Sequence, residues 1–307
     1  MDIKISNLTK SYGSQRAVDG ISFEVKTGEI LGFLGPNGAG KTTTMKMITG
    51  YIDIQDGEVL IGGQSVKTGT TKQYVGYLPE HNPLYTDMPV MDYLEFCAAL
   101  QGVPKPQIPE RVREMVRVCG LDVEKHKNIA ELSKGYRQRV GLAQAMIHDP
   151  EILILDEPTT GLDPNQIVEI RELIRQLGKE KTVILSTHIL PEVEATCDRI
   201  LIINRGQIVA DGTADTLRKQ AQGQQVLRAR IEGAGAMDVQ KALQQLPSIA
   251  TSEILDAEAG RFELQSQPEQ VSNRAVFELC VQQGWALTEL VPFETRLEDI
   301  FRDLTLN

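Results

Sequence analysis

The eight residues from Gly35 to Thr42 follow the spacing G-x-x-x-x-G-K-T, a pattern for binding phosphate groups. Glycines at this spacing let the backbone turn tightly, so that its N–H groups point inward and surround an anion. Lys41 is expected to reach the outer phosphates and the Thr42 hydroxyl to bind Mg²⁺. The pattern therefore predicts a nucleoside triphosphate with its metal ion. The residues expected at the phosphates are Gly35, Pro36, Asn37, Gly38, Ala39, Gly40, Lys41, Thr42 and Thr43.

Two adjacent acids, Asp156 and Glu157, follow the apolar run 152–155. Such a run predicts a buried parallel strand, and its carboxyl end is where α/β sheets bind ligands. Asp156 is expected to hold the magnesium ion, and Glu157 to polarise the attacking water as a general base. The alternative is a solvated strand end, which the phosphate-binding pattern disfavours. The two segments together predict nucleotide hydrolysis.

The segment 132–139, with the sequence Leu-Ser-Lys-Gly-Tyr-Arg-Gln-Arg, resembles the signature sequence of the ATP-binding cassette (ABC) ATPases. In that family the signature presents a serine, a glycine and a helix N-terminus to the γ-phosphate bound by the other subunit. Ser133 and Gly135 match the family, whereas Lys134 and Tyr136 replace the usual Gly and Gln. Lys134 either adds positive charge at the phosphate or points to solvent. Ser133 also suits a helix N-cap.

Other short segments agree with this resemblance. Residues 161–164 resemble the family's D-loop, which crosses between the two subunits and contributes Asp163 to the shared site. His188, at the end of an apolar run, resembles the switch histidine that contacts the γ-phosphate. Tyr12 stands where the family stacks an aromatic ring on adenine, with Val18 expected to pack nearby.

Residues 75–80 resemble the family's Q-loop, but Glu80 replaces the usual glutamine. A carboxylate remains a good oxygen ligand for Mg²⁺, and it adds negative charge beside the γ-phosphate. Glu80 is therefore expected either to belong to a slightly altered metal site or to stay off the metal and serve coupling alone.

The order of these motifs runs from residue 12 to residue 188, about two-thirds of the chain, which is thereby identified as a member of the ABC ATPases. Membership implies an α/β fold of the P-loop NTPase type: a RecA-like core, an antiparallel β subdomain, and a helical subdomain at about 87–149. Glu80, Lys134 and the tail 297–301 resemble the ATP-binding subunits of bacterial drug and polysaccharide exporters, including the gliding-motility type.

The resemblance implies that a complete site needs the phosphate loop of one chain and Ser133 with Gly135 of another. One set of motifs is present, so two copies of the chain are expected to pair head to tail, as a homodimer, around ATP and Mg²⁺. Hydrolysis would then power transport, which is expected to be export, through a separate membrane permease. The alternative is a soluble ABC ATPase that regulates ribosomes or DNA. Members of that kind carry two cassettes or a long coiled coil, and this chain has neither.

Composition limits the other possibilities. The net charge of −10 and the pI near 5.1 argue against a nucleic-acid partner, which normally meets a basic face. No apolar run approaches the ~20 residues of a membrane helix, and the start lacks a secretion signal. A cytoplasmic chain, held at the inner face of the cell membrane by its permease, is expected. The widely separated cysteines suggest neither zinc nor disulfides.

The chain is expected to contain an ABC domain (1–215), a polar linker (216–225) and an accessory α+β domain (226–307). In the accessory domain the order strand, helix, strand, strand, helix, strand predicts a ferredoxin-like unit, with a last helix at 297–304. It shows no titratable cluster or glycine loop, which favours a structural or dimer-contact role. Helices of the ABC domain are expected at 43–49, 91–100, 109–119, 135–148 and 164–177.

Overall fold

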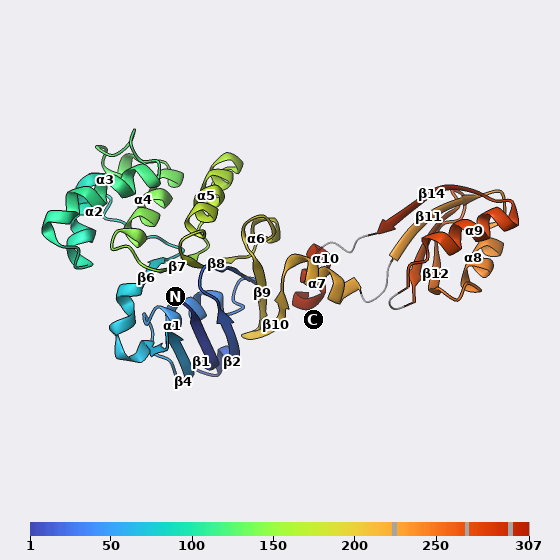
Figure 1. Ribbon diagram of the computed structural model, residues 1–307, viewed down its shortest axis with the longest axis horizontal. Helices are drawn as coiled ribbons and strands as arrows, with labels where there is room; N and C mark the ends of the chain where they lie inside the picture. The colour runs from blue at the N-terminus through green and yellow to red at the C-terminus, as the bar shows by residue number, and fades with distance from the viewer. Residues whose placement is uncertain (223–225, 268–269, 294–296, 307) are drawn as a thin grey trace. The chain divides into compact units, whose positions relative to one another are not determined.

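The computed structural model describes residues 1–222, 226–267, 270–293 and 297–306 (Figure 1). The chain divides into two compact units, residues 1–213 and 214–307. The first unit ends two residues before the expected end of the ABC domain. Among the described residues, no helix is both long enough and apolar enough to cross a lipid bilayer.

A six-stranded sheet forms the centre of the first unit, with the strand order β10-β9-β3-β8-β7-β6. The strands are β3 (Ile30–Leu34), β6 (Val75–Leu78), β7 (Ile152–Asp156), β8 (Thr182–Thr187), β9 (Arg199–Asn204) and β10 (Gln207–Gly212). All neighbours are parallel except β10, which forms an antiparallel hairpin with β9. Every residue of β3, β7 and β8 is buried, which explains why these strands are continuous apolar runs.

A second, antiparallel sheet has the order β2-β1-β4-β5. Its strands are β1 (Ile3–Tyr12), β2 (Gln15–Val25), β4 (Asp56–Ile61) and β5 (Gln64–Ser65). Helix α1 (Lys41–Ile48) follows the phosphate loop, and its Met45 shares one hydrophobic core with Ile5 of the antiparallel sheet and Phe33 of the central sheet. This core fixes the start of α1, and with it the phosphate loop, between the two sheets.

Helices α2 (Val90–Leu100), α3 (Ile108–Val118) and α4 (Lys134–Met146) form the helical subdomain and gather together in Figure 1. Their buried side chains share a second core with strand β7, through Tyr93, Val116 and Leu153. Helices α5 (Pro164–Leu177) and α6 (Leu190–Thr196) complete the unit. Short 3₁₀ turns occupy Val66–Thr68, Thr70–Tyr74, Lys105–Gln107 and Ile129–Glu131. The expected α/β fold with a helical subdomain is confirmed.

The second unit contains an antiparallel sheet of order β12-β13-β11-β14. Its elements are β11 (Val226–Glu232), α8 (Ala236–Gln244), β12 (Ile249–Asp256), β13 (Arg261–Ser266), α9 (Asn273–Gln283) and β14 (Ala286–Phe293). This is the expected order of strands and helices. The sequence predicts the second helix of this unit at 269–283; residue 269 lies outside the described residues, and α9 begins at Asn273.

The expected linker at 216–225 is wrong over its first part, because helix α7 (Ala214–Gln222) occupies it; residues 223–225 lie outside the described residues. Helix α7 contacts the last helix, α10 (Leu297–Leu306). Leu217 is 2% exposed, and Leu297 and Ile300 of α10 are also buried. Burial of an apolar side chain against another helix stabilises a short polar segment that would not be helical alone.

Candidate functional site

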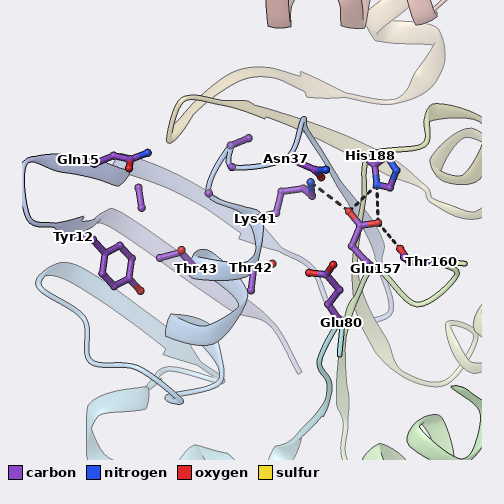
Figure 2. A pocket seen from close by; sticks show the side chains of 14 residues that line it. Tyr12, Gln15, Asn37, Lys41, Thr42, Thr43, Glu80, Glu157, Thr160 and His188 are labelled. Carbon is purple, nitrogen blue, oxygen red and sulfur yellow. Dashed lines mark hydrogen bonds and ion pairs between the residues drawn. The ribbon is translucent and has the colours of Figure 1, made fainter. Parts of the chain in front are cut away.

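A cavity of about 460 Å³ lies at the carboxyl ends of strands β3, β7 and β8 (Figure 2). Cavities of roughly 300–1,000 Å³ commonly hold small-molecule ligands. The loops that follow the three strands bring together the phosphate-binding residues, Glu157 and His188, as expected. The residues that line the cavity are Tyr12, Gln15, Ala17, Asn37, Gly38, Ala39, Gly40, Lys41, Thr42, Thr43, Glu80, Glu157, Thr160 and His188.

Two glycines give the phosphate loop its shape. Gly38 and Gly40 have φ angles of 78° and 109°, in the left-handed region that glycine adopts readily. A Cβ atom at Gly38 would meet open space, whereas one at Gly40 would overlap the backbone carbonyl oxygen of Ala17. Only glycine therefore fits at position 40, where it caps the start of α1. The N–H groups at this helix start form a site for an anion.

Lys41 is 6% exposed and is held by backbone carbonyl groups. Its Nζ donates to the carbonyl oxygens of Gly35, at 2.7 Å, and Pro36, at 3.3 Å. It also lies 3.4 Å from Oε1 of Glu157. Gly35 and Pro36 do not line the cavity; they orient the lysine instead. An anion in the loop would therefore meet an ammonium group that is already in position.

Glu157 has a φ of 51°, which costs a non-glycine residue roughly 1–2 kcal/mol. Several contacts hold this conformation: its N–H donates to the carbonyl oxygen and the hydroxyl of Ser186, at 3.2 and 3.0 Å. The Thr160 hydroxyl donates to Oε2 at 3.2 Å, and Nδ1 of His188 lies 2.9 Å from the same oxygen. Figure 2 shows Lys41, His188 and Thr160 converging on this carboxylate. Strained backbone that its surroundings hold firmly clusters at functional sites.

Asp156 provides the test of whether the site fits Mg²⁺. Its side chain is fully buried, and Oδ1 accepts a hydrogen bond from the Ser186 hydroxyl at 2.5 Å. Oδ2 is buried with no hydrogen-bond partner among the described residues. Burial raises the pKa of Asp156, and the nearby charges of Glu80 and Glu157 raise it further. A free carboxylate oxygen near the Thr42 hydroxyl suits a hard cation.

No group of three or more acidic, histidine or cysteine side chains could hold a metal ion in the described part of the chain. Proteins usually bind Mg²⁺ through one or two carboxylates together with the phosphates of the substrate. Asp156, Thr42 and Glu80 would be the protein ligands in such a site.

Glu80→Gln is predicted to weaken Mg²⁺ binding, because it removes one negative charge from the edge of the cavity. A charge about 4 Å from a cation in water is worth about 1 kcal/mol, roughly a fivefold change in affinity. We expect the half-saturating Mg²⁺ concentration for ATP turnover to rise by this factor. Glu58→Gln removes an exposed carboxylate outside the cavity and serves as the control. An unchanged Mg²⁺ requirement would leave Glu80 with a role in coupling alone.

The residues expected at the adenine ring fall into two groups. Tyr12 is 54% exposed and lines the cavity, together with Gln15 and Ala17, which the sequence did not indicate. Val18 does not line the cavity; its side chain is fully buried in the hydrophobic core, and its expected place near the adenine ring stays a prediction. Successive side chains of a strand point to opposite faces, so Ala17 faces the cavity where Val18 faces the core.

Ser133, Gly135 and Asp163 do not line the cavity. The Ser133 hydroxyl accepts from the N–H of Tyr136 at 3.3 Å and caps helix α4. Asp163 caps helix α5 by accepting from two backbone N–H groups, each at 3.0 Å. A Cβ atom at Gly135 would stand only 2.7 Å from the carboxamide of Gln166. Within one chain, therefore, the signature residues are separate from the phosphate loop.

Lys134 is exposed to solvent, one of its two expected directions, and the other, charge at the γ-phosphate of a second chain, stays a prediction. Its Nζ lies directly against Gly161 of the D-loop segment in the same chain, where a Cβ atom would overlap it. The lysine thus extends from the start of the signature helix toward the D-loop of its own chain.

Ser186 is a site residue that the sequence analysis missed. Its hydroxyl donates to Asp156 and accepts from the N–H of Glu157. In the parallel pairing of β7 with β8, Ser186 stands opposite Asp156. The sequence could have indicated this residue, because Ser186 lies near the end of the apolar run that leads to His188 and the neighbouring strand ends in Asp156.

Comparison with known proteins agrees with the geometry. The family model described as ABC transporter matches residues 18–160. The ABC transporter ATP-binding protein YxlF of Bacillus subtilis is 33% identical over 302 residues, covering 97% of this chain and 98% of that protein. The bacitracin transport ATP-binding protein BcrA of Bacillus licheniformis is 40% identical over 222 residues, covering 71% and 72%.

Solved structures match about seven-tenths of this chain. An ATP-binding subunit of an ABC transporter is 31% identical, with a TM-score of 0.65, covering 72% of this chain and 93% of that chain. A dimeric bacterial ABC transporter cassette has the same fold at 23% identity, with a TM-score of 0.64 and coverage of 69% and 98%. This chain belongs to the ABC transporter ATP-binding proteins, and it is an ATPase of that family.

Proposed function

We propose that this chain is the ATP-binding subunit of an exporter, and that two cassettes enclose ATP between them to power a separate membrane permease. The observation that carries the proposal is the incomplete cavity. Lys41, Glu157 and His188 converge in it, whereas Ser133 and Gly135 stand outside it. A second chain can supply the signature residues that one chain leaves away from its own phosphate loop.

The reaction we propose is attack of water on the γ-phosphate of ATP. Glu157 accepts the proton from the water, and Lys41 and His188 offset the charge that develops on the phosphate oxygens. Tyr12 stacks against the adenine ring at the exposed end of the cavity. Mg²⁺, held by Asp156 and Thr42 with Glu80 nearby, would neutralise phosphate charge when bound.

Pairing of two chains follows from the same arrangement. The N-terminus of α4, with Ser133 as its cap, is a favourable place for the γ-phosphate held by the other chain. Asp163 lies at the segment that would cross between the two sites. The dimeric cassette of the same fold supports this pairing. ATP then favours the closed dimer, and hydrolysis removes the contact that holds it closed.

The membrane partner would bind the helical subdomain. Tyr85 and Phe96 are 55% and 39% exposed there, with ring centroids 5.7 Å apart, and Leu100 is 71% exposed. Aromatic side chains are enriched in the cores of protein interfaces. The similarity to a bacitracin transport protein supports a role in export. The chain would then be a peripheral protein at the inner face of the cell membrane.

Tyr85→Ser together with Phe96→Ser is predicted to release the chain from its membrane partner. Loss of central aromatic contacts at an interface costs about 2 kcal/mol or more, roughly thirtyfold in affinity. We expect the tagged chain to co-purify from detergent extracts with a protein of several membrane-spanning helices, and the double variant to recover far less of it. Tyr51→Ser alters an exposed aromatic outside the helical subdomain and is the control.

The alternative function, regulation of ribosomes or DNA, makes a different prediction for the same preparation. The chain would then sediment with ribosomes or bind nucleic acid, and no membrane protein would accompany it. The net charge of −10 speaks against that outcome.

A further inference from the structure

Glu192 is a buried carboxylate that no step above uses. It lies on helix α6, is 4% exposed, and does not line the cavity. Its Oε2 accepts two hydrogen bonds, from the hydroxyls of Thr159, at 2.7 Å, and Thr187, at 2.9 Å. Its Oε1 is buried with no hydrogen-bond partner among the described residues. A buried carboxylate is costly, so its presence at this position calls for a reason.

The two hydroxyls belong to the two segments that carry the reacting groups. Thr159 lies two residues after Glu157, in the loop that leaves strand β7. Thr187 is the last residue of β8 and directly precedes His188. One oxygen of Glu192 therefore accepts hydrogen bonds from the segments that follow two neighbouring strands. These segments carry Glu157 and His188, which meet in the cavity.

The bond to Thr187 also fixes the backbone on both sides of His188. A hydroxyl has one hydrogen, and that of Thr187 is donated to Glu192. This orientation leaves the oxygen free to accept from the N–H of Ile189, at 3.0 Å. His188 is thus held between Thr187 and Ile189, whose side-chain and backbone groups bond to each other across it.

The bond to Thr159 acts on the other segment. The loop it anchors contains Thr160, whose N–H and hydroxyl both bond to Glu157, each at 3.2 Å. Glu157 needs such support because its backbone is in the left-handed region. Hydrogen bonds to an ionised acceptor are about twice as strong as neutral ones, which suits a carboxylate to this task.

We propose that Glu192 is a positioning residue for hydrolysis. Through the hydroxyls of Thr159 and Thr187 it fixes the positions of Glu157 and His188 relative to each other. The inference rests on the proposed roles of Glu157 and His188. Glu192 itself would not touch ATP.

Glu192→Ala is predicted to lower kcat for ATP by at least tenfold, with KM for ATP changed by less than twofold, because the phosphate loop keeps its own contacts. Glu192→Gln is predicted to retain most of the activity, since one amide oxygen can accept both hydroxyls. The chain has four histidines, so their ring signals can be followed by NMR. Those of His188 should move in Glu192→Ala and stay near their original positions in Glu192→Gln, while the other three stay fixed.

Thr187→Val and Thr159→Val each remove one of the two bonds and keep the test open if Glu192→Ala does not fold. Each should lower kcat by less than Glu192→Ala does. The double variant Glu192→Ala, Thr187→Val should be no slower than Glu192→Ala alone, because both changes break the same link.

Three results would overturn the proposal: full kcat in folded Glu192→Ala, equal losses in the Ala and Gln variants with unmoved His188 signals, or full kcat in both threonine variants. Glu157→Gln is measured beside them. If Glu157→Gln is inactive and Glu192→Ala is fully active, only the role of Glu192 fails. If Glu157→Gln keeps its turnover, the assignment of the base itself fails.

Discussion

Glu157→Gln is expected to lower ATP turnover by a factor of about 10²–10⁴, the usual contribution of a general base, while ATP binding persists. The glutamine has nearly the same shape but cannot accept the proton from water. Lys41 keeps its bonds to the carbonyl groups of Gly35 and Pro36, so the phosphate loop should remain formed. Phosphate release measures turnover, and equilibrium binding of ATP to the same preparation measures affinity.

The same variant is expected to double its mass in light scattering when Mg²⁺ and ATP are added, because an uncleaved γ-phosphate stays between the two chains. Ser133→Asp in this background should prevent the dimer, and Ser133→Asn is the matched neutral control. Aspartate and asparagine both cap helices well, so helix α4 should survive either change. Only aspartate places a negative charge against the phosphate of the other chain.

Other outcomes for Glu157→Gln have definite meanings. Retained turnover would move the base to another residue. A persistent monomer would indicate a different cassette as the partner or a need for the membrane protein. A dimer without ATP would point to a lasting contact elsewhere, with the second unit as the first place to look.

Gly40→Ala is expected to abolish ATP binding and to destabilise the fold. The added Cβ atom would overlap the carbonyl oxygen of Ala17, and the φ of 109° is unfavourable for alanine. A left-handed backbone costs about 1–2 kcal/mol, and forced overlap in a packed site costs about 1–3 kcal/mol more. Urea unfolding measures the loss of stability, and titration with ATP measures the loss of the site.

Gly38→Ala separates the cost of the left-handed backbone from the cost of steric overlap. Gly38 also has a left-handed φ, 78°, but a Cβ atom there would meet open space. This variant should lose only the about 1–2 kcal/mol of backbone strain. Equal destabilisation by the two substitutions would show that the segment around Ala17 yields to the added atom.

The first unit was predictable where function and fold depend on local spacing. Strands β3, β7 and β8 are buried on both faces, so each is a plain apolar run, and the chemistry-bearing residues follow directly at their carboxyl ends. Because parallel strands end at the same edge of a sheet, placing the phosphate loop, Glu157 and His188 together required only the order of the strands.

The sequence alone was insufficient where the answer depends on contacts between distant segments. Val18 and Ala17 are both small and apolar, and only the pairing of the strand decides which of them faces the cavity. Helix α7 is polar in sequence, and its burial against α10 comes from the other end of the second unit. Lys134 lies against Gly161 because the start of helix α4 meets the D-loop segment, which no local pattern reveals.

The contact between α7 and α10 also bears on how the second unit can change during evolution. The βαββαβ sheet begins after one of these helices and ends before the other, so both of its connections lead to a single helix pair. Insertions are tolerated well when the chain leaves and returns near one place. The sheet can therefore be exchanged for a different module, or reduced to a short connection, while Leu217 stays covered. The sheet is thus an insertion between two helices that pack on each other.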